Sequence, residues 1–450
     1  MIIMKIDRQT LKDLEIFENF NGFSIFDIAN LTLTPGGEKE LKKFFSSPQT
    51  SKTEIIKTQN MFKYIIEKNW QITLHKNQIY FIRNYLQSKI KPIKNKNILF
   101  LFIKGTIYRF KHKDSGLFSH YEYIKEGIYF LKDFLDFLYD IYVSIDDDAP
   151  KKIREISDKI YRFLKIDPIA NLYSKNTHKL SFLEIFKYDN IFRHSLIHEI
   201  HDMIRLFFEI DALISIARFI QSYNLTFPKF IESDKPLFDI KNAYHIFLSE
   251  PVKNSFKFEN NDNFVFLTGP NMSGKTTFLK SCGLSLYFAH LGIGVPAESL
   301  TLTYFDEMIS DINTQDNIQM GYSYFYNEVK RVKYISKKIS KNKRIFVLLD
   351  ELFRGTNVQD AFEGTKQVIK GFTNWENSLF ILSSHLVELE KEIKKYPGIS
   401  FKHFDSDVVE NTPSFNYKLK KGVSHKRIGL LILKNENILD ILNKNQFSNK

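Results

Sequence analysis

Cysteine is almost absent from the chain, since Cys282 is the only one among 450 residues. A single thiol excludes an internal disulfide and a cysteine-rich zinc site, and it fits a reducing compartment, so we expect a cytoplasmic protein. The first residues lack the apolar run of a signal peptide, and no segment approaches 18 uninterrupted apolar residues. We therefore expect no membrane span and no membrane partner.

Acidic residues are scarce in one long stretch. Residues 51–113 contain 14 Lys and Arg but only Glu54 and Glu67 as acids, with aromatic residues interleaved, in a chain of formal net charge +12. Such a stretch is typical of a surface that faces nucleic acid, because each contacted phosphate requires a nearby positive charge. It is equally typical of a solvated face in a lysine-rich protein, and the sequence alone leaves both interpretations open.

Aromatic and aliphatic residues are plentiful. The hydrophobic share is 43%, with 43 Phe and 22 Tyr, which is ample for packed cores and argues against a largely disordered chain. Helical spacing of apolar residues dominates up to about residue 230 and includes a long helix expected over residues 197–221. After residue 235, short apolar runs alternate with helical stretches, at 246–248, 264–267, 345–349 and 379–382, which indicates a mostly parallel α/β sheet.

The most specific motif follows the second of these runs. Thr268-Gly-Pro-Asn-Met-Ser-Gly-Lys-Thr-Thr277 lies between an expected strand and an expected helix, which is the context that a G-x-x-x-x-G-K-[ST] phosphate-binding loop requires. Glycines let the backbone N–H groups face one anion, and the following helix dipole adds positive charge. Lys275 is expected to reach the β- and γ-phosphates and Thr276 to ligate Mg²⁺. The predicted nucleotide-binding residues are Gly269, Pro270, Asn271, Met272, Ser273, Gly274, Lys275, Thr276 and Thr277.

Two further groups of polar residues follow expected strands. Asp350 and Glu351 end the run 345–349, at the edge where open α/β sheets bind ligands. Asp350 suits a direct or water-mediated contact with Mg²⁺, and Glu351 suits a general base that polarises an attacking water. Ser384 and His385 follow the run 379–382, where His385 is in a position to contact the γ-phosphate.

With these motifs the sequence resembles the MutS family of DNA mismatch-repair ATPases, a branch of the ABC-type P-loop proteins. The similarity is dense in the second half: Gly269–Thr276 matches G-P-N-M-[GS]-G-K-[ST], and Val295-Pro-Ala297 matches V-P-A. Asp316–Glu328 matches the family signature D-[DN]-[LI]-x-x-G-x-S-[TY]-F-x-x-E, and Leu348–Thr356 matches L-L-D-E-x-x-R-G-T. Ser384-His385 occupies the T-H position.

The first half carries weaker similarity. Asn30–Pro48 is similar to the opening segment of the family's core domain, and Asp211–Ala217 is similar to the lever helix that leads into the ATPase. The resemblance therefore implies an α + α/β protein: an all-helical core and lever domain at residues 1–235, followed by an ABC-type P-loop NTPase domain with a mostly parallel sheet at residues 236–450.

The resemblance also implies roles. ATP and Mg²⁺ are the expected cofactors, with Lys275 and the loop amides on the phosphates, Thr276 and Asp350 on the metal, and Glu351 on the water. Ser323 would reach the γ-phosphate of ATP in a neighbouring subunit, and Arg354, Gly355 and Thr356 would cross the same interface. Lys275, Ser323, Glu351 and His385 are the expected catalytic residues, and a complete site implies a homodimer.

Departures from the family limit the functional prediction. The chain begins at the core-like segment, so we expect no mismatch-reading domain, and the tripeptide Phe182-Leu-Glu184 matches the family's Phe-x-Glu reader by chance. Arg427 replaces the usual Ser near the end, and little follows residue 440. We expect a DNA-binding ATPase acting on mismatched or branched double-stranded DNA. The alternative is an ATP-gated protein-interaction module that does not bind DNA.

Overall fold

The computed structural model describes residues 3–19, 22–88, 116–174, 180–259, 261–312, 324–409 and 412–424. Contacts divide the chain into two compact units. The sheet unit consists of Met1–Ile28, Phe45–Gln59 and Ile220–Lys450, and the helical unit consists of Ala29–Phe44 and Asn60–Phe219. Within the described ranges, no helix is both long enough and apolar enough to cross a bilayer.

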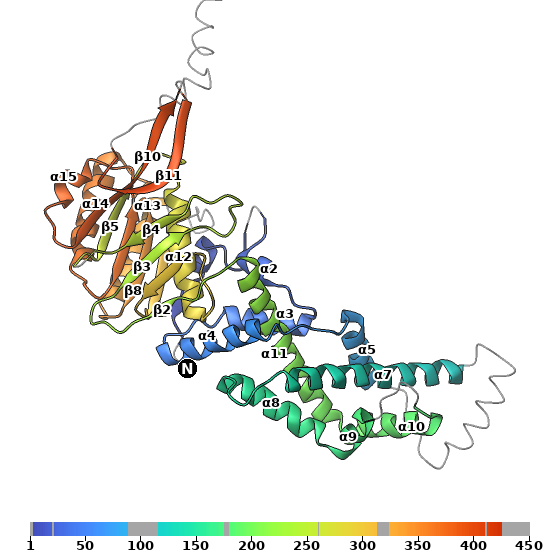
Figure 1. The fold of residues 1–450 in the computed structure, drawn as a ribbon. Helices are drawn as coiled ribbons and strands as arrows, with labels where there is room; N and C mark the ends of the chain where they lie inside the picture. The colour runs from blue at the N-terminus through green and yellow to red at the C-terminus, as the bar shows by residue number, and fades with distance from the viewer. Residues whose placement is uncertain are drawn as a thin grey trace, which may run out of the picture. The chain divides into compact units, whose positions relative to one another are not determined.

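The sheet unit is built on a seven-stranded sheet in the order β1-β7-β8-β9-β5-β10-β11. Figure 1 labels β5, β8, β10 and β11 of this sheet. Every neighbouring pair is parallel except the β10–β11 hairpin. The central strands are fully buried apolar runs, as expected of parallel strands covered on both faces. The strands are β1 (Lys5–Ile6), β5 (Phe264–Thr268), β7 (Glu307–Asp311), β8 (Ile345–Asp350), β9 (Leu379–Ser383), β10 (Ile399–Val409) and β11 (Thr412–Lys421).

Alternate residues of the central strands face two different layers. On one face, Phe266 and Val347 belong to a buried core completed by residues of α13 (Tyr324–Ile339), α14 (Val358–Thr373) and α15 (Leu389–Ile393). On the other face, the side chain of Leu348 lies against Gly283 of α12 (Lys275–Leu291), where an added Cβ would come within 2.8 Å of it. The parallel sheet is therefore covered on both sides.

A second, smaller sheet, in the order β2-β6-β3-β4, belongs to the same unit. Its Phe238 ring lies 5.0 Å from the ring of Phe346 in β8. The other elements of the sheet unit are α1 (Arg8–Asp13) and α2 (Ile25–Ala29), and the strands of the small sheet are β2 (Lys229–Phe230), β3 (Phe238–Ala243), β4 (Asn254–Lys257) and β6 (Ser299–Leu302).

The described part of the helical unit contains only helices. Its longest is α7, and α10 continues into a π-helical turn, η2, before the long α11. The helices that lie wholly or partly in this unit are α3 (Pro35–Phe45), α4 (Lys52–Glu67), α5 (Lys76–Leu86), α7 (Gly116–Val143), α8 (Lys151–Leu164), α9 (Asp167–Tyr173), α10 (Phe182–Asn190), η2 (Ile191–Ser195) and α11 (Ile197–Ser222). The long helix expected over residues 197–221 is thus confirmed within one residue.

One buried carboxylate joins the two family-like segments of this unit. Asp211 of α11 accepts hydrogen bonds from the N–H groups of Leu33 and Thr34 and from the Thr34 hydroxyl, at 2.7–2.9 Å. A Cβ on Gly37 would lie 2.2 Å from the Asp211 carboxylate, so only glycine permits this approach. Burial raises the pKa of Asp211, against the three hydrogen bonds and the Arg218 charge, which act to lower it.

Two expectations are corrected by the structure, and the contact-defined units differ from the expected domain ranges. The range 1–235 is not all helical, because β1 and β2 lie within it and pair with strands of the sheet unit. The first 28 residues also belong to the sheet unit, so the contact-defined units are not the contiguous ranges 1–235 and 236–450. Residues 246–248 form no strand; they follow β3 in a turn, where Ile246 is buried.

The structure also bears on the tripeptide 182–184 and on the basic stretch 51–113. Phe182–Glu184 begins α10, where Glu184 accepts hydrogen bonds from the N–H and hydroxyl of Ser181 at 2.8 Å and so completes a capping box. The sequence of this tripeptide therefore has a local structural explanation. Of the basic stretch 51–113, residues 89–113 lie outside the described residues, as do Ser323 and Arg427.

Candidate functional site

The glycine-bounded loop joins β5 to α12 through unusual backbone angles. Gly269 has φ +148° and Gly274 has φ +101°, and a Cβ on Gly269 would lie 2.8 Å from the Ser273 hydroxyl and 2.9 Å from the Phe404 carbonyl oxygen. Both glycines are therefore required by conformation, and Gly269 also by space. Met272, at the loop tip, adopts φ +65° and is 75% exposed, so a strained residue faces solvent there.

Lys275 begins α12 and is buried, although it carries an ammonium group. Its Nζ donates to the carbonyl oxygens of Gly269 at 2.9 Å and Pro270 at 3.0 Å, which leaves one of its three N–H groups for another acceptor. Burial lowers the pKa of Lys275, against the charges of Asp350 and Glu351, which act to raise it. The amino end of α12 adds positive potential at the same place.

Thr276 lies opposite the end of β8. Its hydroxyl donates to Asp350 Oδ2 at 2.7 Å, and the Ser383 hydroxyl donates to Asp350 Oδ1 at 2.6 Å. The carboxylate is 8% exposed and is thus fixed by two neighbours from β9 and α12. This arrangement follows from the sheet order, since β5, β9 and β8 are adjacent and their carboxyl ends meet at one edge.

Glu351 follows directly and is held in a strained conformation. Its φ is +57°, in the left-handed region, and its N–H donates to the Ser383 carbonyl oxygen at 2.9 Å. Its carboxylate lies 2.7 Å from His385 Nε2 and 2.9 Å from Arg354 Nε. A residue in this region costs on the order of 1–3 kcal/mol and persists where surrounding contacts fix it, which occurs often at functional sites.

The electrostatics of Glu351 favour its charged form. Burial acts to raise the pKa of this carboxyl, but the hydrogen bond and charge of His385, together with the charges of Arg354 and Lys275, outweigh it and lower the pKa. Glu351 is therefore ionised at neutral pH and can accept a proton or a hydrogen bond from a water molecule.

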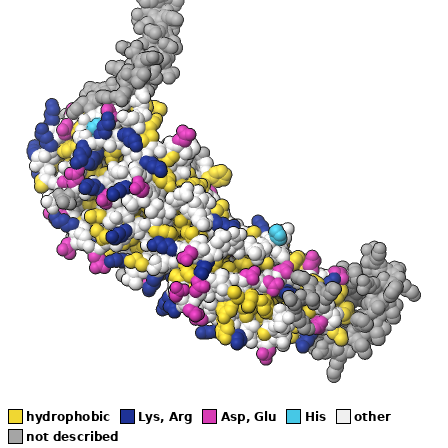
Figure 2. All heavy atoms as spheres, in the orientation of Figure 1, with side chains coloured by type: hydrophobic (Ala, Val, Ile, Leu, Met, Phe, Trp, Pro, Cys, Tyr) yellow, Lys and Arg dark blue, Asp and Glu magenta, His cyan; other side chains and the backbone are white. Residues whose placement is uncertain are grey.

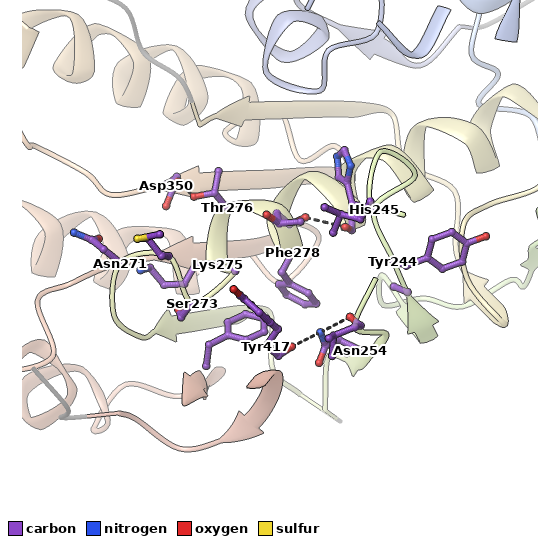
Figure 3. A pocket seen from close by; sticks show the side chains of 18 of the residues that line it. Tyr244, His245, Asn254, Asn271, Ser273, Lys275, Thr276, Phe278, Asp350 and Tyr417 are labelled. Atoms are coloured by element: carbon purple, nitrogen blue, oxygen red, sulfur yellow. Dashed lines mark hydrogen bonds between the residues drawn. The ribbon is translucent and has the colours of Figure 1, made fainter. Parts of the chain in front are cut away.

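The loop residues, Asp350 and Glu351 border a cavity of about 500 Å³ (Figure 3). The loop 271–277 and Asp350 form one part of its wall, and the segment 243–254 after β3 forms another. Tyr417 of β11 lies at the loop itself, with Cδ1 3.4 Å from the position that a Cβ on Gly274 would occupy. An aromatic ring beside a phosphate-type loop is suited to stacking on a planar ligand.

The position of Tyr417 depends on an irregular strand. The β10–β11 register shifts between Phe404 and Ser406, and Tyr417 has φ +52° within the opposed segment. Asn254 of β4 fixes this segment, because its amide donates to the Tyr417 carbonyl oxygen at 2.9 Å and accepts from the Leu419 N–H at 2.8 Å (Figure 3). The bulge therefore directs a side chain that a regular strand would not supply here.

The structure brings together most of the residues expected from the sequence. The loop residues 269–277, Asp350, Glu351 and His385 gather at one sheet edge, whereas Ser323 lies outside the described residues. Their roles stay predictions. Sequence reasoning missed Ser383, Tyr417 and Asn254, which no motif indicated, and it assigned no role to Glu328, which the signature contains.

The oxygen ligands present fit a magnesium ion. Thr276 and Asp350 offer a hydroxyl and a carboxylate within 2.7 Å of each other at the cavity wall, and hard oxygen donors of this kind suit Mg²⁺. No group of three or more His, Cys, Asp and Glu side chains within the described ranges could hold a metal by itself. Mg²⁺ commonly uses one or two protein ligands and completes its shell with water and phosphate, so this donor set is sufficient.

Comparison with known proteins agrees with these features. The sequence profile described as MutS domain V matches residues 265–445. The chain is 28% identical to human MutS protein homolog 4 over 59% of the chain and 30% of that protein. It is 22% identical to the DNA mismatch repair protein MutS of Petrotoga mobilis over 95% of the chain and 62% of that protein. It is 32% identical to the Thermotoga maritima protein of the same name over 52% of the chain and 29% of that protein.

The chain spans less than two thirds of the length of each of these relatives. The similarity nevertheless covers both the site-bearing residues and, in the Petrotoga relative, almost the whole chain. These matches support assignment of the chain to the MutS family.

Proposed function

We propose that this chain binds Mg²⁺ and ATP in the cavity beside α12 and hydrolyses ATP to ADP and phosphate. The observation that carries the proposal is the convergence of Lys275, the Thr276–Asp350 pair and Glu351 on one 500 Å³ cavity. A buried lysine at a helix amino end suits a polyphosphate, and a hydroxyl paired with a carboxylate suits its magnesium ion. The match of residues 265–445 to MutS domain V supports the same assignment, because proteins of the MutS family are ATPases.

Each residue has a distinct part in the proposed reaction. Lys275 exchanges its contacts with the Gly269 and Pro270 carbonyls for phosphate oxygens, and the loop N–H groups bind the same anion. Mg²⁺ held by Thr276 and Asp350 would supply positive charge against the phosphates. Glu351, ionised and oriented by His385, accepts a hydrogen bond from the attacking water. Tyr417 stacks on the nucleobase.

The site becomes complete in a homodimer of the ABC type. Ser323 of one protomer would contact the γ-phosphate bound by the other, and Arg354, Gly355 and Thr356 would lie at the same interface. Arg354 pairs with Glu351 of its own chain at 2.9 Å, so closure of the dimer would have to redirect this guanidinium. Two composite sites at one interface then couple ATP binding to association.

We further propose that ATP turnover controls how the protein binds mismatched or branched double-stranded DNA. Support comes from the relatives, two of which are named DNA mismatch repair proteins, and from the excess of Lys and Arg in residues 51–113. Counterion release predicts that such binding weakens steeply with salt. Reversing the charge of Lys89, Lys91, Lys94 and Lys96 should abolish DNA binding.

The decisive experiment measures the ATPase rate of the purified protein with no DNA, homoduplex, a single mismatch and a four-way junction, at two salt concentrations. A rate that changes with one DNA form, and changes less at high salt, supports coupling and identifies the substrate class. An unchanged rate with no DNA retained at low salt contradicts the DNA assignment. Absence of turnover under all conditions contradicts the ATPase assignment.

A second candidate function has its own observation. Hydrophobic side chains gather on the face of the helical unit shown in Figure 2. Tyr139, Val143 and Tyr161 are 36%, 58% and 43% exposed, and Tyr142 stacks on Tyr161 with ring centroids 5.7 Å apart. Exposed tyrosines are enriched in protein interfaces, which favours an ATP-gated protein-interaction module. Under this alternative the four lysine reversals leave ATPase activity nearly unchanged and a Tyr161→Asp variant loses the protein partner.

A further inference from the structure

The amino-terminal helix α1 is joined to α13 by a largely enclosed ion pair. Asp7 caps α1, since its Oδ1 accepts from the Thr10 N–H at 2.8 Å, and its Oδ2 lies 2.5 Å from Nη1 of Arg331 in α13. The two side chains are 20% and 14% exposed. Burial acts to raise the pKa of Asp7, but the hydrogen bond and charge of Arg331 lower it, so the carboxyl is ionised at neutral pH.

The same contacts extend to the end of β7. Arg331 also donates to the Ser310 carbonyl oxygen, and the Thr10 hydroxyl accepts from the Ser310 N–H at 2.8 Å. Asp13, at the other end of α1, is fully buried and accepts from the Ser310 hydroxyl at 2.5 Å and the Ile312 N–H at 2.9 Å. Helix α1 therefore links α13 to the end of β7, in addition to the apolar packing of α13 on the sheet.

Glu328 of α13, three residues before Arg331, contacts the loop of the candidate site that contains Glu351. Glu328 is 2% exposed, and its carboxylate accepts from the N–H groups of Arg354 at 3.1 Å and Gly355 at 3.3 Å. Burial raises the pKa of Glu328, against these two hydrogen bonds and the Arg354 charge. Because residues three apart are neighbours on a helix surface, one turn of α13 links α1 to the loop that contains Glu351 and Arg354.

We propose that Asp7 and Arg331 form a positioning pair for ATP hydrolysis. They hold α13 so that Glu328 keeps the loop 351–355 in place, and this fixes the position of Glu351 relative to Thr276 and Asp350. The inference rests on the proposed ATPase function and deepens it. Neither residue lines the site cavity, so the pair would act through α13 and the loop. A displacement of about 1 Å at the reacting groups can cost on the order of 100-fold in rate, so a remote pair can control turnover without changing nucleotide affinity.

The test compares Asp7→Asn, Arg331→Met and Arg331→Lys with the wild-type protein. Asparagine is nearly isosteric and still caps α1, which protects folding. The readouts are kcat, KM for ATP, the dissociation constant of a fluorescent ATP analogue and the thermal midpoint. We expect kcat to fall about 10- to 100-fold in Asp7→Asn and Arg331→Met, with nucleotide affinity within about twofold of wild type, since only orientation is lost. Arg331→Lys should recover part of kcat.

The matched control is Lys338→Met. Lys338 lies two turns further along α13, and it pairs at 2.5 Å with Glu307, which is 3% exposed and stands at the opposite end of β7 from Ser310. Loss of this pair should lower stability and leave kcat near the wild-type value. An equal fall of kcat in the control, or unchanged kcat in the Asp7 and Arg331 variants, overturns the inference while wild-type turnover upholds the proposed function. A wild-type protein without turnover overturns both.

Discussion

The Thr276 hydroxyl donates a 2.7 Å hydrogen bond to the Asp350 carboxylate, although the two residues are 74 positions apart in the chain. The contact exists because β5 and β8 both pair with β9, and the segments that follow them open at the same sheet edge. A hydroxyl and a carboxylate held in this way offer two oxygens in a fixed geometry. The consequences for metal dependence can be tested directly.

Thr276→Val should abolish the enhancement of ATP affinity by Mg²⁺. The variant has the same shape but lacks the hydroxyl, and it also leaves the buried Asp350 with one hydrogen-bond donor fewer. Loss of one ligand and of a charge-assisted hydrogen bond, worth about 1.5–3 kcal/mol, predicts at least a tenfold weaker affinity in Mg²⁺. Titration of a fluorescent ATP analogue in Mg²⁺ and in EDTA measures the effect. Thr276→Ser is the control and should behave as wild type; equal Mg²⁺ enhancement in the valine variant would contradict the assignment.

Glu351→Gln should bind ATP and fail to turn it over. The amide keeps the size of the side chain and removes the negative charge that orients the water, and general-base groups contribute about 10²- to 10⁴-fold to rate. Steady-state ATPase assays and nucleotide titrations give the two quantities. The control is Glu363→Gln, which changes an exposed glutamate of α14 that pairs with Lys366. Retained steady-state turnover in Glu351→Gln would remove this residue from the role of base.

Tyr417→Ala should weaken ATP binding and leave the binding of inorganic triphosphate unchanged. The ring is planar and uncharged, so it is suited to stacking on the base rather than to binding the phosphates. Stacking of a base on an aromatic side chain is worth about 1–3 kcal/mol, which predicts roughly a 5- to 150-fold loss of ATP affinity. Competition of both ligands against a fluorescent nucleotide separates the two contributions. Tyr417→Phe should bind like wild type, and an equal loss of affinity for both ligands in the alanine variant would argue against stacking.

The strands that position the phosphate loop were predictable because they are local signals. The predicted runs 264–267, 345–349 and 379–382 begin at the first residues of β5, β8 and β9, and each ends one residue before its strand ends. Parallel strands buried on both faces appear in sequence as continuous apolar runs. The hairpin β10–β11 was not predicted, because polar residues such as Lys402, His403 and Asp405 interrupt its pattern. Strand β1 has two residues, and its pairing with β7 depends on contacts some 300 positions away.

The candidate site divides in the same way. Lys275, Asp350 and Glu351 follow from motifs in which the residue type and its place after a strand are sufficient evidence. Ser383 is found only once β8 and β9 are known to be neighbours, since its hydroxyl acts across the strand pair. Tyr417 depends on a register shift that no local pattern records. Contacts between elements, rather than the elements themselves, were therefore the unpredictable part.

Lowering the pH should destabilise the sheet unit at pH values higher than those at which carboxylates protonate. His245 and His290 are buried, and burial lowers the pKa of each to about 4 from an ordinary value of 6.5. Between about pH 4 and 6.5 the unfolded chain therefore binds two more protons than the folded chain. The free energy of unfolding is thus highest above pH 6.5, where both histidines are neutral in either state, and it falls as the pH falls toward 4. We expect a loss of about 2 kcal/mol for each histidine on going from pH 7.5 to pH 5.

Urea unfolding at pH 7.5, 6 and 5 measures this loss, with Trp375 as the reporter of the sheet unit in a Trp70→Phe background, since the chain has two tryptophans. His290→Gln should lower the unfolding free energy at pH 7.5, because His290 is hydrogen-bonded to the Gln49 carbonyl at 2.6 Å, yet it should reduce the pH dependence by about half. His198→Gln changes an exposed histidine and should preserve the full pH dependence. A pH dependence in His290→Gln as steep as in the parent would show that His290 takes up its proton in the folded state, and the buried-neutral assignment would then be wrong.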